Sequence, residues 1–239
     1  MSRLGYIPDV HDPRDLHFGK LGIGKALPAS FSLRKYVVEV LDQGDTSKCV
    51  AHSFAQALRI ADKIAGVASP QLASRDFLYY NSLAYDSDGF VDQGTQLRSC
   101  AKGLSKFGRP PESACPFKHD PLVERPAWEA YREAFDHKGP SAYLRVATLD
   151  EIKQALAAGK PVVGGASVGN SIFDASATGV YDPAPNEPKI GGHAMTFVGF
   201  DASSFLLCNS WGTGYADGGF FRVSPRFAAT FSDLWAIHL

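Results

Sequence analysis

The sequence of 239 residues contains no apolar run near the roughly 20 residues that a membrane-spanning helix requires. Its formal net charge is only −1, from 24 basic and 25 acidic residues, so no overall field favours nucleic acid or an acidic membrane. The N-terminus, "MSRLGYIPDVHDPRDLHFGK", lacks the apolar segment of a secretory signal. We therefore expect no nucleic-acid or membrane partner, and a protein that is cytoplasmic or exported by a leaderless route.

Cysteine is also scarce, and four cysteines in a chain of this size do not form a disulfide framework. No CxxC pair is present, and Cys49 with His52 is the only close Cys/His pair. A structural zinc site needs four nitrogen or sulfur ligands, so a metal site is not expected. A disulfide between Cys100 and Cys115 remains open at this point.

What the sequence does contain is a change of pattern along the chain. Apolar residues recur at helical spacing from Cys49 to about Gly66, and helical patterns also cover 69–83 and 95–107. After about Gly139 the chain turns to short β-rich runs bounded by Gly, Asp, Asn and Pro. This order predicts an α+β fold with a helical half at about 40–138 and a β half at about 139–239.

The stretch "LDQGDTSKCVAHSFAQAL" places Cys49 directly at a predicted helix start. In one interpretation Ser47 caps the helix and Cys49 is a small packed residue. In the other, the helix dipole and free N–H groups favour an ionised, nucleophilic thiol.

A nucleophilic cysteine needs a base, and the base needs a group that holds its ring. His193 follows two glycines and precedes an apolar strand in "IGGHAMTFVGF", although a purely structural histidine fits equally well. Asn209 and Trp211, in "FLLCNSWG", could fix the His193 tautomer and cover that hydrogen bond, or could be a turn asparagine beside a core tryptophan.

The three stretches "DQGDTSKCVAHSFA", "GGHAMTFVGFD" and "NSWGTGYADGGFFRV", in this order, resemble the papain family of cysteine peptidases. The resemblance runs from about Leu27 to the C-terminus. It implies a papain-like fold, with a helical left subdomain, a β-barrel right subdomain and an active-site cleft between them. It also implies a domain division into an arm at 1–26 and a peptidase domain at 27–239.

The resemblance implies a thiol peptidase in which Cys49 attacks the scissile carbonyl and His193 is the acid/base. Asn209 would orient His193, and Gln43 with the Cys49 N–H would bind the oxyanion. A thiolate–imidazolium pair would be the resting form, and no metal or organic cofactor is implied. The implied partner is a peptide or protein substrate, which would contact Gln93, Gly94, Gly191, Gly192, Ala194 and Trp211.

Several positions depart from the family pattern. Thr46 replaces a disulfide cysteine, Val50 and His52 replace an aromatic pair, and Gly192 replaces the usual Asp or Asn. The departures resemble a divergent bacterial branch. Alternatives are an acyl-transferase or amidase with the same catalytic residues, and a non-catalytic binding protein of this fold.

The arm at its N-terminus contains "GYIPDVHDPRD", whose apolar and proline residues predict an extended segment docked on the catalytic domain. We expect a structural clasp away from Cys49. The alternative is a position along the cleft, where the arm would act as a short built-in inhibitor.

Overall fold

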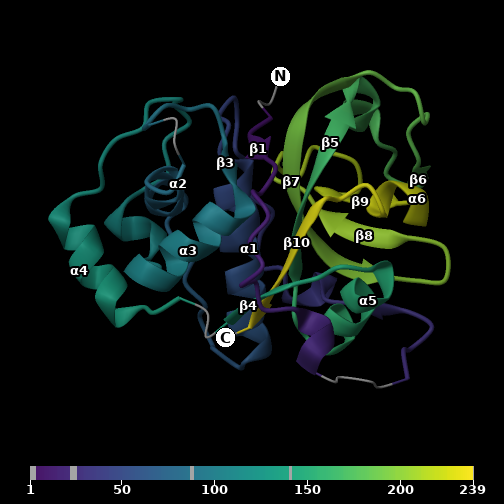
Figure 1. Ribbon diagram of the computed structural model, residues 1–239, viewed down its shortest axis with the longest axis horizontal. Coiled ribbons are helices and arrows are strands. Elements are labelled where there is room, and N and C mark those ends of the chain that lie inside the picture. Colours follow the sequence, from purple (N-terminus) through teal and green to yellow (C-terminus); the bar gives the residue numbers. More distant parts are fainter. Residues whose placement is uncertain (1–3, 22–25, 87–88, 140–141, 239) are drawn as a thin grey trace.

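The computed structural model describes residues 4–21, 26–86, 89–139 and 142–238. The first four α-helices lie on one side, and the main sheet lies on the other together with α5 and α6, which agrees with the predicted α+β order (Figure 1). The helical side holds α1 (Cys49–Ile64), α2 (Arg75–Leu83), α3 (Leu97–Phe107) and α4 (Trp128–Asp136). Among the described helices, none combines the length and the apolar character needed to cross a membrane.

Helix α1 is the central helix of the molecule. Its apolar residues lie on more than one face, and all but a few of its sixteen residues are buried. One face packs on the other helices and another on strand β7 (Lys189–Phe200). A helix enclosed in this way holds its first residue, Cys49, at a fixed position between the two halves.

The other helices differ in detail from the sequence prediction. Helix α2 begins only at Arg75, because Ser74 caps it by accepting a hydrogen bond from the Phe77 N–H. Helix α4 was not predicted, because only Ala130 and Ala134 of its residues are buried. Short 3₁₀ turns complete the set: η1 (Phe18–Leu21), η2 (Arg34–Tyr36), η3 (Glu112–Ala114) and η4 (Asn170–Asp174).

Eight strands form the main sheet, in the order β4-β10-β5-β7-β8-β9-β6, with β2 paired to β7. Over the described residues this hydrogen-bonded path has two ends, so the predicted barrel is an open sheet. The central strands are long and buried because they are apolar along most of their length. The strands are β2 (Phe31–Ser32), β4 (Ala142–Arg145), β5 (Val162–Gly169), β6 (Val180–Tyr181), β7, β8 (Phe205–Cys208), β9 (Phe220–Val223) and β10 (Asp233–His238).

Two further helices, α5 and α6, lie in this half of the molecule. Helix α5 (Leu149–Ala157) is capped by Thr148, whose side chain accepts from the Glu151 N–H. The Glu151 carboxylate in turn accepts from the Ala147 N–H. Helix α6 (Pro225–Ala228) is a single turn after β9.

The N-terminal arm lies between the two halves (Figure 1). Its strand β1 (Tyr6–Ile7) pairs in parallel with β3 (Thr95–Gln96), and Tyr6 is buried. The predicted extended backbone is confirmed. The predicted location is wrong, because the arm lies over Cys49 and not away from it, as the next section shows.

Candidate active site

Cys49 is the first residue of α1 and is fully buried. The preceding residue, Lys48, takes the cap position without a side-chain cap hydrogen bond. The predicted Ser47 cap is wrong, because the Ser47 N–H and hydroxyl both donate to Asp92. The N–H groups of Cys49 and Val50 lower the thiol pKa, as expected at a helix start.

His193 lies on β7 with its ring fully buried, and its Nε2–H donates to Asn209 Oδ1 at 2.7 Å. The Trp211 ring stacks on the imidazole at 4.7 Å between centroids, and Phe173 stacks on the other side of Trp211. This bond and its aromatic cover are the arrangement that the sequence predicted. The Nδ1 atom of His193 has no hydrogen-bond partner among the described residues.

Strand β7 brings the thiol and the imidazole together. The N–H of Ala194, the residue after His193, donates to the Cys49 sulfur. Asn209 follows the neighbouring strand β8, and its Oδ1 also accepts from the Ser210 N–H at 2.8 Å. The structure therefore brings Cys49, His193 and Asn209 to one place from three separate elements.

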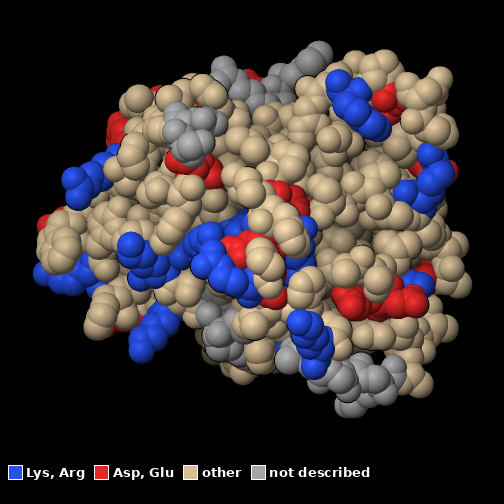
Figure 2. All heavy atoms as spheres, in the orientation of Figure 1, with Lys and Arg blue, Asp and Glu red and all other residues tan. Residues whose placement is uncertain are grey.

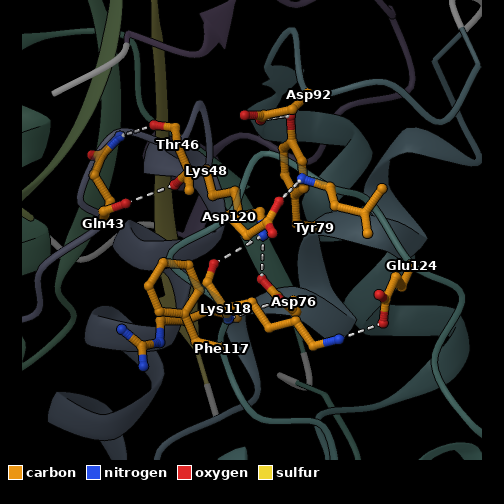
Figure 3. Close-up of polar contacts among 12 residues, drawn as sticks. Gln43, Thr46, Lys48, Asp76, Tyr79, Asp92, Phe117, Lys118, Asp120 and Glu124 are labelled. Carbon is orange, nitrogen blue, oxygen red and sulfur yellow. Dashed lines mark hydrogen bonds and ion pairs between the residues drawn. The ribbon is translucent and has the colours of Figure 1, made fainter.

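Gln43 lies in the turn before α1, and its side chain is held at both ends. Its Nε2 donates to the Thr46 carbonyl at 2.7 Å (Figure 3). Its Oε1 accepts from the Ser210 hydroxyl at 2.7 Å. The Gln43 backbone N–H donates to the Ser210 carbonyl, which fastens this turn to the segment that carries Asn209. A primary amide carries two N–H donors, so this orientation is compatible with a second contact from Nε2.

The start of α1 is further held by buried polar groups. Lys48 points toward Asp76 with 2.8 Å between Nζ and Oδ1 (Figure 3). Asp92 also accepts from the Tyr79 hydroxyl at 2.9 Å, and Tyr79 accepts from the Gly94 N–H at 3.0 Å. These bonds connect the helix start to the Gln93-Gly94 segment, close to where the family disulfide residue is replaced by Thr46.

The arm covers the thiol directly. The Gly5 N–H donates to the Cys49 sulfur, and the Gly5 carbonyl accepts from the Thr95 N–H at 2.9 Å. A Cβ on Gly5 would lie 1.8 Å from the Ser47 carbonyl oxygen, so only glycine fits here.

The arm also occupies the positions predicted to contact substrate. A Cβ would lie 2.2 Å from the Gly5 oxygen if placed on Gly94, and 2.1 Å from the Tyr6 oxygen if placed on Gly192. Leu4 packs in the same way against Gly191. These glycines leave the backbone bare along the path that the arm now takes.

Comparison with known proteins agrees with this geometry. Residues 27–230 match the family model described as papain family cysteine protease. The chain belongs to the papain family of cysteine proteases. It is also 32% identical to a peptidase C1-like protein of Acanthamoeba polyphaga mimivirus, over 98% of this chain and 86% of that protein.

Solved structures of the family show the same fold. Xylellain, a cysteine protease from Xylella fastidiosa, is 30% identical with a TM-score of 0.88, covering 99% of this chain and 96% of xylellain. A procathepsin B from Trypanosoma congolense is 16% identical with a TM-score of 0.77, covering 98% and 84%. The chain is a thiol-dependent cysteine peptidase with the papain-like fold.

In this papain-family site burial disfavours the charged forms of both reacting groups while the arm is docked. Burial raises the pKa of the Cys49 thiol to about 11, more than the N–H groups around the sulfur offset. Burial lowers the pKa of His193 to about 4, against the opposing effect of the Asn209 hydrogen bond. Burial in the closed state therefore opposes the predicted thiolate–imidazolium pair, which stays a prediction.

The remaining histidine and cysteine near the site have structural roles. His52 is buried, with Nδ1 2.8 Å from the Lys48 carbonyl and Nε2 3.2 Å from Arg75 Nη1. Burial, and then the neighbouring positive charge of Arg75, hold the pKa of His52 well below its usual range. Cys100 and Cys115 are both free thiols, so the open question of a disulfide between them is answered.

Three further residues of the site were missed in the sequence. Asp233, at the start of β10, accepts from the Asp9 N–H at 2.7 Å and from the Tyr6 hydroxyl. Tyr6 and Asp9 lie in the stretch that the sequence predicted to dock on the catalytic domain. No sequence pattern pointed to Asp233, because its position beside the arm depends on the order of the strands in the sheet.

Proposed function

We propose that this peptidase cleaves peptide bonds through Cys49 and is held latent by its own N-terminal arm. The observation that carries the proposal is the His193–Asn209 hydrogen bond under Trp211, which leaves Nδ1 without a partner among the described residues, while the N–H of the next residue, Ala194, faces the Cys49 sulfur. In the open cleft, Nδ1 is the atom that exchanges a proton with the thiol and with the leaving amine. Gln43 and the Cys49 N–H then stabilise the tetrahedral oxyanion.

Latency follows from the contacts of Gly5. Burial under the arm raises the pKa of the thiol and so disfavours the reactive thiolate in the closed molecule. The arm backbone also fills the space above the sulfur where a scissile carbonyl would enter. The likeness to xylellain supports the divergent bacterial type, while the mimivirus relative shows a related chain outside bacteria.

The test uses the full chain with Gly5→Ala, whose new Cβ collides with the Ser47 carbonyl and so displaces the arm. We expect labelling of Cys49 by an epoxide thiol probe to accelerate more than tenfold, and a peptide library to be cleaved. Gly214→Ala is the matched control, because a Cβ on Gly214 meets nothing within 4 Å. Its labelling rate should equal that of the unchanged protein.

Three results would contradict the proposal. Equal labelling of the Gly5→Ala and Gly214→Ala proteins would show that the arm does not block the thiol. Undiminished cleavage by a Gly5→Ala, Cys49→Ala protein would show that another nucleophile acts. Acyl transfer to an added amine without peptide cleavage would assign the same residues to a transferase.

A further inference from the structure

His52 lies in the first turns of α1, fully buried, and its two ring nitrogens face partners of opposite kind. Nδ1 lies 2.8 Å from the Lys48 carbonyl, which can only accept, so Nδ1 carries the proton. Nε2 lies 3.2 Å from Arg75 Nη1, a guanidinium nitrogen that can only donate, so Nε2 accepts. The two contacts together assign one neutral tautomer to the ring.

Arg75 is itself held in place at Nε2. Its Nη2 donates to Glu112 Oε1 at 2.7 Å, and its backbone N–H donates to Glu112 Oε2 at 3.1 Å. The guanidinium also lies 4.3 Å from the centre of the Phe117 ring, and the His52 ring meets the same ring edge-on at 4.7 Å. A cation fixed at this nitrogen opposes a second proton on the imidazole, so the ring keeps Nε2 as an acceptor.

The carbonyl that His52 contacts belongs to the same peptide group as the Cys49 N–H. This carbonyl accepts twice, from the His52 backbone N–H at 3.1 Å and from Nδ1–H, which its two lone pairs allow. Hydrogen bonds in a chain polarise one another, so donation to the carbonyl makes the N–H of that peptide a stronger donor. Since Cys49 begins the helix, the helix provides no acceptor for its N–H, which is left for the oxyanion.

The other proposed oxyanion donor is also connected to this ring. The Asp42 carbonyl is a second backbone acceptor near the imidazole, and Asp42 directly precedes Gln43. His52 is therefore placed beside the backbone before each of the two donors, Gln43 and Cys49. An aromatic hydrocarbon ring, which the family pattern gives at this position, could pack here but could donate to neither carbonyl.

We propose that His52 is a positioning residue of the oxyanion hole, whose Nδ1–H polarises and holds the Lys48–Cys49 peptide so that the Cys49 N–H binds the oxyanion more strongly. It acts through these buried bonds, without touching the substrate. This inference rests on the proposed cleavage through Cys49. One oxyanion donor contributes a factor of about 10² to 10³ to kcat, and a polarising bond strengthens its neighbour by about 10–30%. Losing that share lowers kcat by about twofold to eightfold.

The experiment uses the full-length Gly5→Ala protein and one peptide substrate. His52→Phe keeps a flat ring beside Phe117 and removes the donor, so kcat should fall about twofold to eightfold while KM changes little. His52→Asn retains an N–H donor at the position of Nδ1 and should restore most of the loss. His137→Phe is the matched control, because His137 Nδ1 lies 3.1 Å from the Glu133 carbonyl in the same local contact at the exposed end of α4. Its kcat should be unchanged.

A second measurement separates an effect on the oxyanion from damage to the helix start. Methyl methanethiosulfonate is neutral and forms a disulfide with the thiolate without creating a tetrahedral oxyanion. Its rate of inactivation, followed by the remaining peptide cleavage, should be the same in all these proteins. An equal loss of kcat and of inactivation rate in His52→Phe, or an unchanged kcat, would overturn the proposal. Failure of His52→Asn to recover activity would do so as well.

The tautomer can be tested without a substitution. Nitrogen NMR of the ring in the unchanged full-length protein should show His52 Nδ1 protonated and Nε2 unprotonated. A proton on Nε2 would overturn the proposal, because Nδ1 could then not donate to Lys48. Absence of cleavage by the Gly5→Ala protein itself would instead contradict the function proposed above, and this inference with it.

Discussion

The Oδ1 atom of Asn209 accepts two hydrogen bonds, one from His193 Nε2–H and one from the Ser210 N–H. The residue thus fixes which imidazole nitrogen faces the thiol. In the Gly5→Ala background, Asn209→Ala should lower kcat more than it raises KM, because the base is misoriented while substrate contacts remain. Steady-state kinetics on one peptide provide the measurement, and equal kcat in both proteins would remove Asn209 from the mechanism.

Gln43 is the second residue whose role can be isolated. In the same open background, Gln43→Ala should reduce kcat by roughly 10² to 10³, the usual effect of losing one oxyanion donor. Because Gln43 also bonds to Thr46 and Ser210, the melting temperature must be measured alongside. A protein of native stability with undiminished kcat would show that the oxyanion is bound by other groups.

Among single residues, the sequence predicted chemistry better than it predicted capping. Cys49, His193 and Asn209 lie in short motifs whose order along the chain is enough to bring them together. Ser47 has the composition of a cap, yet Asp92, 45 positions later, takes its hydrogen bonds. A capping prediction uses only local neighbours and cannot include such a competitor.

At the scale of elements, the arm is the least predictable piece. Its extended backbone follows from Pro8 and Pro13, but its position follows from Gly94, Gly165 and Gly192 on elements far away in the chain.

Helix α4 was also missed in the sequence. Trp128 and Phe135 are 71% and 78% exposed, so its apolar residues do not mark the buried face.

The docked arm is stabilised by polar contacts as well as by the fit of its backbone and side chains. Tyr6→Phe keeps the ring in its pocket and removes only the hydroxyl that donates to Asp233. We expect about a tenfold faster labelling of Cys49 in the otherwise unchanged full-length protein, because the docked state alone loses this bond. Identical labelling of the Tyr6→Phe and unchanged proteins would show that the hydroxyl does not stabilise docking.

For the molecule as a whole, arm docking should depend on pH through Asp9. Burial and the nearby charge of Asp233 raise the pKa of Asp9 to about 6, despite favourable contacts with Arg98 and Trp235. The other charged groups nearby, Arg145 and Asp15, belong to the same ion-pair cluster. Figure 2 shows such mixing of acidic and basic side chains near the centre of this face.

Since the Asp9 pKa is raised on docking, the docked state binds more protons than the released state between about pH 4 and 6. Docking is therefore strongest at low pH and weakens as pH rises through 6. The Cys49–His193 pair carries one proton both as a neutral pair and as an ion pair, so it adds no dependence in this window.

Hydrogen exchange of the backbone amides of residues 5–9, corrected for intrinsic rates, measures this effect. Protection should fall from pH 5 to pH 7 in the unchanged protein and stay flat in Asp9→Asn. Protection that rises with pH would contradict the assignment.

The whole fold is also expected to be insensitive to reductant. Cys49, Cys100 and Cys208 are buried free thiols and Cys115 is partly exposed, so none of the four cysteines forms a disulfide. The melting temperature should be the same with and without a dithiol reductant. A decrease of several degrees on reduction would show that a disulfide forms in solution.

The bonds that hold the arm join opposite ends of the chain: Tyr6 reaches Asp233 across 227 positions, and Asp9 reaches Trp235 across 226. The arm is made before its partners on β10, and closing so long a loop costs chain entropy. The contacts with Asp233 and Trp235 therefore require that the chain has been made as far as β10, so the arm cannot be docked in this way on a shorter nascent chain.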